Sequence, residues 1–301
     1  MIDNLPHISV CVCTYKRPHL LVRILGELAT QETGGLFTHS IVIADNDGLQ
    51  SAKAPVEDFT ARSPVAVKYC LEPRQSIALA RNKVVENAEG DFLAFIDDDE
   101  RPGDQWLLTL FRACNAPGVD GVLGPVQRRF EVEPPKWVMD GLFYERPVFP
   151  TGSVVKWRDA RSGNVLVKKH VFPSDEKPFR PEFRGGEDRD FFRRMIEKGF
   201  VFIWCDEAVS YEIVPPTRWK RTVLLRRALL RGAVTLFDPN FGVREIVKSA
   251  IAVPVYALAL PFSLLLGQHK FMDLMVRLCD HLGKLLAVVG LNPVKEPYVT
   301  E

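Results

Sequence analysis

The sequence predicts an α/β fold, with a mainly parallel sheet covered by helices on both faces, followed by a helical region that associates with a membrane. Apolar, β-branched runs alternate with helical patterns along residues 8–204, which is typical of parallel strands joined by crossover helices. Acidic residues gather where these runs end. Past residue 216 the chain becomes basic, and residues 249–268 carry no charge. We therefore predict one domain over residues 1–215 and a membrane-association region over residues 216–301.

The composition describes a folded chain without a global affinity for nucleic acid. Among 301 residues, 39 are Lys or Arg and 38 are Asp or Glu, so the net charge is only +1. This average hides an asymmetry, because residues 216–301 hold 12 Lys or Arg against 6 Asp or Glu. The six cysteines form no Cys-x-x-Cys pair, and no secretory signal is evident. We therefore expect reduced thiols, a cytosolic compartment and no nucleic-acid partner.

Four apolar runs are expected to form the buried strands of the first half. They are residues 8–13, 41–44, 65–70 and 92–96. A helix is expected from Pro18, which suits a first helical turn, and another from residue 77, where Ser76 can act as the N-cap. Ligands of such sheets bind outside the carboxyl ends of the strands, so we expect the functional site at that edge.

The second half is less regular. Its expected elements are a helix ending near residue 114, strands at 121–130, 164–168 and 201–204, and a helix at 187–198. A basic amphipathic helix follows over residues 218–231. The uncharged stretch 249–268 is long enough to cross a bilayer. Because Pro254 and Pro261 lie inside it, a spanning helix, a re-entrant segment and an interfacial segment all stay open.

The acidic triplet Asp97-Asp98-Asp99 is the sharpest local signal. It ends the fourth strand, where alternate side chains point the same way, so we expect Asp97 and Asp99 to face one site. Two carboxylates this close repel each other unless a cation joins them, and oxygen ligands suit Mg²⁺ or Mn²⁺. The alternative is a solvated acidic turn. We favour the metal site, whose remaining positions suit a diphosphate.

Two further acidic motifs lie at the ends of predicted elements. Asp45 could accept hydrogen bonds from a uracil imide or from ribose hydroxyls, or it could be only a turn residue in Asp-Asn-Asp-Gly. Gly185 and Gly186 precede three acids in the first turn of a helix. Those acids either compensate the helix dipole or include a general base for a sugar hydroxyl, and the glycines would let another molecule approach the backbone.

Other kinds of chemistry are not indicated. No Gly-x-Gly-x-x-Gly or Walker-type sequence occurs, and the serines lack the Gly-x-Ser-x-Gly elbow of a nucleophile. We expect His281 to be an exposed helical residue, and Cys11 and Cys13 to be small core residues.

Taken together, these motifs resemble glycosyltransferase family 2, whose fold is GT-A. The likeness covers residues 8 to about 212 and rests on motifs in the expected order, at residues 12–17, 42–46, 76–82, 97–99 and 186–188. More narrowly, the chain resembles the ExoM-type glucosyltransferases of succinoglycan-like exopolysaccharide assembly. This resemblance rests on residues 121–126, 185–192 and 226–232.

The resemblance implies a role for each matching residue. The nucleotide sugar would be bound by Thr14, Arg17, Asp45, Arg81, Asp97 and Asp98. Asp99 would hold Mg²⁺ or Mn²⁺ on the diphosphate, Glu187 would bind the acceptor, and Asp188 would be the catalytic base. Such enzymes invert the anomeric carbon in one displacement. The chain lacks the several spanning helices of processive members, so we expect one sugar per encounter.

The resemblance also implies the partners. The donor would be a nucleoside-diphosphate sugar such as UDP-glucose, and the acceptor a polyprenyl-diphosphate-linked saccharide. Residues 216–301 would hold the enzyme, peripheral or monotopic, at the cytoplasmic face of the inner membrane, and their alternative role is a helical subdomain. The alternative functions are a membrane-recruited sugar-nucleotide-binding protein without transfer activity and an Asp-x-Asp phosphatase. The phosphatase is disfavoured because its acidic pair should follow the first strand.

Overall fold

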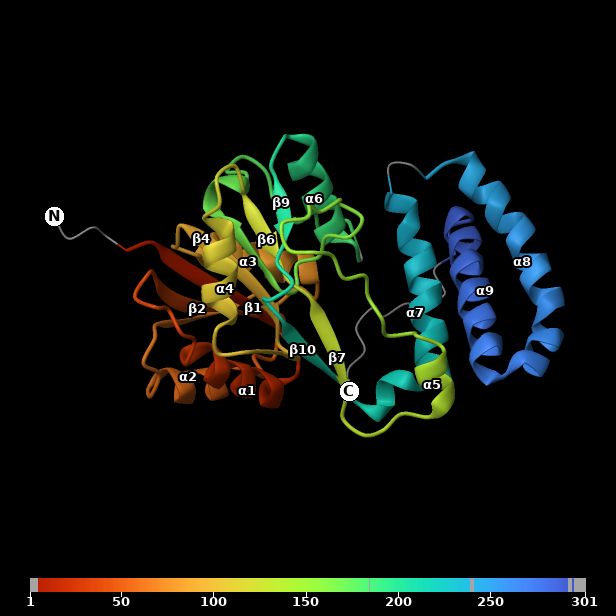
Figure 1. The fold of residues 1–301 in the computed structure, drawn as a ribbon, viewed down its shortest axis with the longest axis horizontal. Coiled ribbons are helices and arrows are strands. Elements are labelled where there is room, and N and C mark those ends of the chain that lie inside the picture. The colour runs from red at the N-terminus through yellow and green to blue at the C-terminus, as the bar shows by residue number, and fades with distance from the viewer. Residues whose placement is uncertain (1–4, 184, 239–240, 292–293, 295–301) are drawn as a thin grey trace. The chain divides into compact units, whose positions relative to one another are not determined.

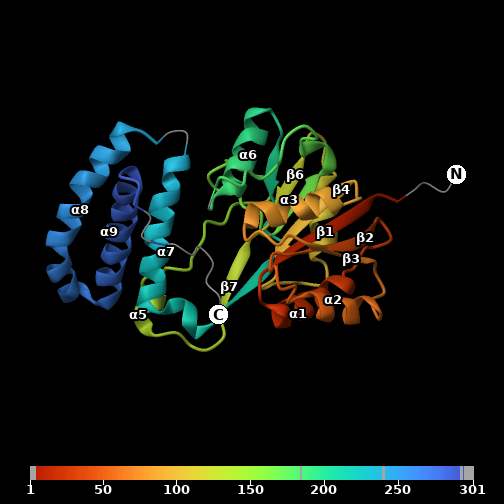
Figure 2. The same ribbon diagram turned by 180° about the vertical axis from the view of Figure 1, so that it is seen from behind.

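The computed structural model describes residues 5–183, 185–238, 241–291 and 294 (Figures 1 and 2). It divides into two compact units. Unit 1 comprises residues 1–127, 146–182 and 187–213, and unit 2 comprises residues 128–145, 183–186 and 214–301. The last junction lies close to the domain boundary predicted at residue 215. Two earlier segments, which the sequence does not separate from the first domain, also belong to unit 2.

Unit 1 is built on a seven-stranded sheet of order β3-β2-β1-β4-β8-β6-β9. The strands are β1 (His7–Thr14), β2 (Thr38–Asp45), β3 (Val67–Leu71), β4 (Phe92–Asp97), β6 (Gly121–Leu123), β8 (Val165–Lys168) and β9 (Phe202–Trp204). Strands β1 to β4 are parallel, β8 is antiparallel to β4 and β6, and β9 is parallel to β6. The sheet is therefore mainly parallel, as predicted, with one reversed strand.

Helices cover both faces of this sheet. One layer holds α1 (Pro18–Ala29), α2 (Lys53–Thr60) and α4 (Trp106–Cys114), and the other holds α3 (Ile77–Asn87) and α6 (Glu187–Glu197). Strand β1 supplies both cores, because successive side chains of a strand point to opposite faces. Ile8, Val10 and Val12 join the core with α1, whereas Cys11 joins the core with α3. Cys11 is thus a core residue, as predicted.

Local sequence signals explain where two of these helices begin. Pro18 occupies the first turn of α1, where its missing N–H costs nothing. Ser76 caps α3, and its side chain accepts a hydrogen bond from the backbone N–H of Leu79 at 3.5 Å. Both predicted helix starts are confirmed.

The single strand predicted over residues 121–130 is wrong. The chain forms β6 and then β7 (Val126–Phe130), which lies in a second sheet of order β5-β10-β7. Gly124 and Pro125 separate the two strands. A Cβ at Gly124 would lie 2.2 Å from the carbonyl oxygen of Ala208, and Pro125 has no N–H for a ladder. The other strands of this sheet, β5 (Glu100–Pro102) and β10 (Ser210–Val214), are too short and polar for the apolar pattern to indicate them.

Unit 2 consists mainly of helices. They are α5 (Lys136–Asp140), α7 (Arg221–Val234), α8 (Val243–Ser263) and α9 (Gln268–Val288), and α9 packs between α7 and α8 (Figures 1 and 2). Within the described residues, Val243–Leu266 is the one helical segment long and apolar enough to cross a membrane, by length and composition. Within this segment, the most apolar stretch of 18 residues has a mean hydropathy of 2.0, and only 11% of that stretch is buried inside the protein.

His281 on α9 corrects a prediction. The residue is buried, with 8% of it exposed, because α8 packs over this face of α9. Its Nδ1 lies 2.9 Å from the Oγ of Ser249 on α8, and its ring lies against Tyr256. The sequence around His281 does not indicate this contact, because the contact arises only when α8 packs on α9.

Candidate active site

The carboxyl ends of three neighbouring strands of unit 1 bring the predicted site residues together. Thr14 of β1 pairs in register with Asp45 of β2, and Cys13 of β1 pairs with Asp97 of β4. Asp98 and Asp99 follow directly on β4. The acidic triplet therefore lies with Thr14 and Asp45 at the edge of the sheet that the sequence indicates.

Asp98 is the buried member of the triplet. Its Oδ2 accepts a hydrogen bond from the Thr14 hydroxyl at 2.8 Å, and its Oδ1 accepts one from Arg17 Nη1 at 3.3 Å. The same Arg17 nitrogen donates to Asp99 Oδ2 at 3.2 Å. Burial raises the pKa of Asp98 to about 7, against the opposing charge of Arg17. Asp98 thus fixes the triplet to the end of β1, and Thr14 and Arg17 reach it together.

Asp97 is the open member of the triplet. Its side chain is 48% exposed, and its Oδ1 lies 3.8 Å from Nη2 of Arg81 on α3. Its partly buried position raises the pKa of the Asp97 carboxyl, Arg81 works against that rise, and the Asp99 carboxylate adds to it. Asp97 therefore keeps exposed carboxylate oxygens that a bound molecule can reach.

Arg81 joins the triplet to the start of α6. Its Nη1 donates to Oε1 of Glu187, and both side chains are buried. Burial acts to lower the pKa of Arg81. The carboxylates of Glu187, Asp188 and Asp97 outweigh this effect, so the pKa of Arg81 is raised above its ordinary value. One guanidinium therefore lies among carboxylates from β4 and from the Gly-Gly-Glu-Asp motif.

Glu187 is nearly enclosed, with 3% of the residue exposed. Burial raises the pKa of its carboxyl to about 7, the Arg81 charge opposes that rise, and the adjacent Asp188 carboxylate adds to it. Its second oxygen, Oε2, has no hydrogen-bond partner among the described residues. A buried carboxylate oxygen without a donor is costly, so this atom is suited to accept a hydrogen bond from a hydroxyl of a bound molecule.

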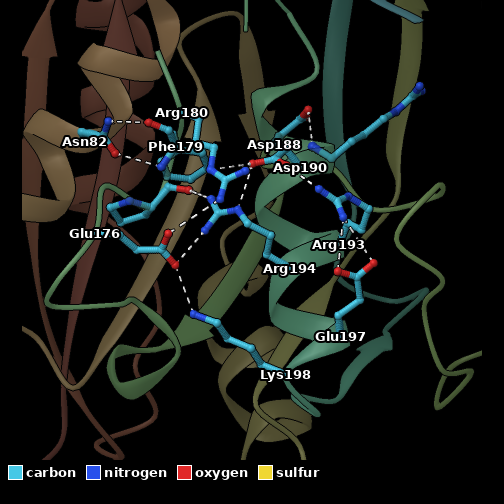
Figure 3. A network of polar contacts seen from close by, with 12 residues as sticks. Asn82, Glu176, Phe179, Arg180, Asp188, Asp190, Arg193, Arg194, Glu197 and Lys198 are labelled. Atoms are coloured by element: carbon cyan, nitrogen blue, oxygen red, sulfur yellow. Dashed lines mark hydrogen bonds and ion pairs between the residues drawn. The ribbon is translucent and has the colours of Figure 1, made fainter. Parts of the chain in front are cut away.

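A second network holds α6 in place (Figure 3). Asp190, one turn into the helix, accepts hydrogen bonds from Arg193 and Arg194, both at 2.9 Å. Arg194 continues to the carbonyl of Pro178 and to Glu176 Oε1, the latter at 3.1 Å. The first turn of α6 is therefore tied to the segment that precedes it. Asp188 in the same turn is half-buried and accepts a hydrogen bond from the backbone N–H of Arg189 at 2.8 Å.

Asn82 ends the motif at residues 76–82, although the resemblance assigns it no role, and in the structure it positions the site. Its Nδ2 donates to the carbonyl of Phe179 at 2.6 Å, and its Oδ1 accepts from the N–H of Phe179 at 3.0 Å. Both polar atoms of the amide are satisfied by one residue of the segment that leads to α6 (Figure 3). Asn82 directly follows Arg81, so α3 fixes both this segment and Glu187. Its place at the end of that motif, beside Arg81, is the sequence signal for this role.

Gly186 has a backbone reason to be glycine. Its φ is +80°, in the left-handed region that other residues rarely adopt, and Gly185 has a φ of +151°. The chain uses these angles to turn directly before α6. The glycines are therefore explained by the turn itself, whether or not another molecule approaches them.

Asp45 lies at the same edge of the sheet, but its carboxylate is occupied. It is fully buried, and its two oxygens accept hydrogen bonds from the backbone N–H groups of Asp47 and Ala52, each at 3.0 Å. The Tyr69 hydroxyl donates a third, also at 3.0 Å. Burial raises the pKa of Tyr69, and the Asp45 carboxylate adds to this. This geometry favours the second interpretation of Asp45, a turn residue.

The carboxylates of β4 suit a hard divalent cation as partial ligands. Asp97 and Asp99 offer oxygen donors, and their repulsion contributes to the raised pKa of Asp97, which a cation would relieve. In the part of the chain that the structure describes, no three His, Cys, Asp or Glu side chains converge to hold a metal by themselves. Mg²⁺ is commonly held by one or two carboxylates together with substrate phosphates, so these residues fit a cation that arrives with a diphosphate.

Comparison with known sequences identifies the family. Residues 9–170 match the family described as Glycosyl transferase family 2. The chain is 30% identical, over 96% of its length and 95% of the relative, to the succinoglycan biosynthesis protein ExoM of Rhizobium meliloti. A shorter match, 26% identical over 37% of this chain and 35% of the relative, is to the GalNAc(5)-diNAcBac-PP-undecaprenol beta-1,3-glucosyltransferase of Campylobacter jejuni.

Solved structures show the same fold at low sequence identity. The mannosyltransferase PcManGT of Pyrobaculum calidifontis, in complex with GDP-Man and Mn²⁺, aligns with a TM-score of 0.63 at 17% identity, over 94% of this chain and 88% of that one. TarS 1-349 of S. aureus, in complex with UDP, aligns with a TM-score of 0.54 at 16% identity, over 93% and 90%. The chain therefore has a fold of the GT-A type. The chain belongs to glycosyl transferase family 2 and is similar to ExoM.

Proposed function

We propose that the protein is an inverting, metal-dependent glycosyltransferase that moves one sugar, glucose, from a UDP-sugar to a hydroxyl of a lipid-linked saccharide in exopolysaccharide biosynthesis. The observation that carries the proposal is the position of Arg81. It lies 3.8 Å from Asp97 of the acidic triplet and pairs with Glu187 beside Asp188. This position supports a single site for the proposed donor and acceptor residues, which come from distant parts of the sequence.

The triplet edge is the proposed donor site. Asp97 would accept hydrogen bonds from the ribose, since its oxygens are exposed, and Asp99 would hold Mg²⁺ or Mn²⁺. When bound, the cation would neutralise charge on the diphosphate that departs. Arg17 and Arg81 add positive charge at the same edge, while Thr14 and Asp98 keep Arg17 in position. The GDP-Man, Mn²⁺ and UDP complexes of the similar structures support a donor of this class.

The start of α6 is the proposed acceptor site. Glu187 would accept a hydrogen bond from an acceptor hydroxyl through its unpartnered Oε2. Asp188 would take the proton of the reacting hydroxyl as that oxygen bonds to the anomeric carbon. The bond from this carbon to the diphosphate breaks in the same step, and the nucleoside diphosphate leaves with the electron pair. One displacement inverts the anomeric configuration.

A lipid-linked acceptor would explain the helices of unit 2. A saccharide on a polyprenyl diphosphate is reached at a membrane surface, and α8 is apolar and mostly unburied. The printed name of the Campylobacter relative includes an undecaprenol-linked acceptor, which supports this class. We place the enzyme at the cytoplasmic face of the inner membrane, where nucleotide sugars are available.

An Asp188→Asn variant tests the proposal. Asparagine keeps the size of the side chain but cannot take a proton, so transfer should fall about 10²–10⁴-fold, the usual contribution of a general base. Binding of UDP-glucose with Mn²⁺, measured by calorimetry, should be unchanged. The control is Asp58→Asn on the exposed surface of α2, which should keep full transfer. If Asp188→Asn transfers sugar at the unaltered rate, Asp188 is not the base. If no nucleotide sugar binds or raises the melting temperature, the proposed function fails.

A further inference from the structure

The exposed face of α8 carries a continuous apolar stripe. Its large side chains recur every three or four residues, which places them on one side of a helix. They are Val243, Val247, Ile251, Val255, Leu258 and Phe262, and the following turn adds Leu264, Leu265 and Leu266. Leu258 is 75% exposed and Phe262 is 70% exposed. A stripe of this length is not left in water without an occupant.

The opposite face of α8 is already occupied. Ser249 is buried there and meets His281 of α9 at 2.9 Å, and the ring of Tyr256 packs against the same histidine. Helix α9 runs antiparallel beside α8 over most of its length (Figures 1 and 2). If α8 enters a bilayer, α9 therefore enters it alongside α8.

Helix α9 cannot share a membrane-spanning position. Charged residues recur along its whole length, at Lys270, Asp273, Arg277, Asp280 and Lys284. Asp273 and Arg277 pair with each other at 3.0 Å, and both are substantially exposed. If α8 crossed the bilayer, these charges would be carried into the hydrocarbon, where ionised side chains are costly.

Positive charges flank the stripe on its own side. Lys248 and Arg244 precede Ile251 by three and seven residues, so helical spacing places both near the stripe, and both are exposed. Lys270 follows the apolar turn and is also exposed. Residues 249–268 between them carry no charge. This order of cations around an apolar face matches the surface of an anionic lipid bilayer.

We infer that α8 lies in the plane of an anionic membrane, with the stripe among the outer parts of the acyl chains, and that it does not cross the bilayer. Its two prolines, Pro254 and Pro261, are accommodated within the helix and do not create a re-entrant turn. The inference rests on the proposed function for the reason why the protein meets a membrane. Its test uses vesicles without sugar donor or acceptor, so the inference about α8 and the proposed function can fail separately.

The first experiment measures binding of the complete chain to vesicles of phosphatidylcholine and phosphatidylglycerol. In the variant Ile251→Asp/Leu258→Asp, two stripe residues become charged, and the partition coefficient should fall at least about a hundredfold. The matched control is Ala250→Asp/Ala257→Asp, which adds the same charges to exposed positions one residue earlier, off the stripe. It has the same electrostatic cost at an anionic surface but keeps the stripe, so it should bind at least about tenfold more tightly than the stripe variant. Equal binding by all three proteins would overturn the inference.

The second experiment measures depth and separates an in-plane helix from a spanning one. All five native tryptophans precede residue 220, so a tryptophan placed at Val247, Val255 or Phe262 is alone in α8. Lipids brominated at different acyl positions quench tryptophan according to its depth. An in-plane helix predicts equal, shallow quenching at the three positions. A profile that is deepest at Val255 would show a spanning or re-entrant segment and overturn the inference.

A second copy of the chain is the competing occupant of the stripe. Light scattering without vesicles tests it, because a stripe buried between two copies gives a dimer that Ile251→Asp/Leu258→Asp converts to a monomer. That result, together with vesicle binding that the substitutions do not change, would overturn the inference. Circular dichroism and calorimetric binding of UDP-glucose to each variant verify that unit 1 is intact, so a failure of the donor site is recognised as such.

Discussion

Asp45 and Asp97 end the two strands on either side of β1, yet their carboxylates have different surroundings. Asp45 is fully buried, and its oxygens accept three hydrogen bonds from the protein. Asp97 is half exposed, has Arg81 at 3.8 Å, and has a pKa that is raised. A carboxylate whose acceptor positions are filled by the protein maintains the fold, whereas one with unfilled positions is available to a ligand. We therefore expect the same residue type at equivalent strand ends to serve two purposes.

The largest effect is expected where the two sides of the site meet, at Arg81. In Arg81→Met the buried carboxylate of Glu187 loses its cation while Asp188 and Asp97 stay near it. Breaking a buried ion pair from one side costs about 3–5 kcal/mol, so the free energy of unfolding in urea should fall by that amount. Arg81→Lys, which keeps a positive charge, should lose less.

The pairing itself is tested by the double variant Arg81→Met/Glu187→Met. Removing both charges leaves no unpaired ion, so this protein should be more stable than Arg81→Met alone. If the double variant is as unstable as the sum of the two single ones, the ion pair does not hold the site together.

Asp45→Asn should have the next largest effect, on folding rather than on the donor. The amide retains one acceptor oxygen and places an NH₂ group where the Asp45 carboxylate accepts from N–H donors. Charge-assisted hydrogen bonds contribute about 1.5–3 kcal/mol, so we expect the free energy of unfolding to fall by about 2–3 kcal/mol. Affinity for UDP-glucose should stay the same. A loss of affinity at unchanged stability would instead make Asp45 a nucleotide ligand.

Asp97→Asn should show the reverse behaviour. The substitution removes a carboxylate that Asp99 repels, so the melting temperature should stay level or rise. Affinity for UDP-glucose in the presence of Mn²⁺ should fall about tenfold, a change that corresponds to 1.4 kcal/mol. Calorimetry on Asp45→Asn and Asp97→Asn side by side gives the sharpest test of the comparison. Should both variants lose stability and keep affinity, the two carboxylates do not differ in purpose.

The sequence predicted the sheet because its signals are local. Apolar runs, a proline at the start of α1 and a serine before α3 act within a few residues, and the structure confirms each of them. It also predicted that Thr14, Asp45 and Asp97 share one edge, because parallel strands place their carboxyl ends together. The short strands β5 and β10 escaped detection, since three to five residues with alternating polarity are not distinct from a loop.

The contacts that complete the site could not be predicted, because they join residues far apart in the chain. Arg81 and Glu187 are separated by 106 positions, and Asn82 reaches Phe179 across 97. No periodicity or spacing relates such residues. They meet only after α3 and α6 pack on one face of the sheet. The same reason explains His281, whose burial depends on where α8 lies.

His281 gives the smallest predicted effect, on the pH dependence of stability. Burial lowers its pKa from the ordinary 6.5, Lys284 of α9 and Lys248 of α8 add to this, and Asp280 and Glu245 oppose it. The unfolded chain therefore binds this proton more readily than the folded chain, so stability is complete above about pH 6.5 and declines as the pH falls below it. His281→Gln can keep a hydrogen bond to Ser249 but cannot titrate. Its melting temperature should change less between pH 7 and pH 5 than that of the unaltered chain, and equal slopes for the two proteins would show that the histidine is not protonated on unfolding.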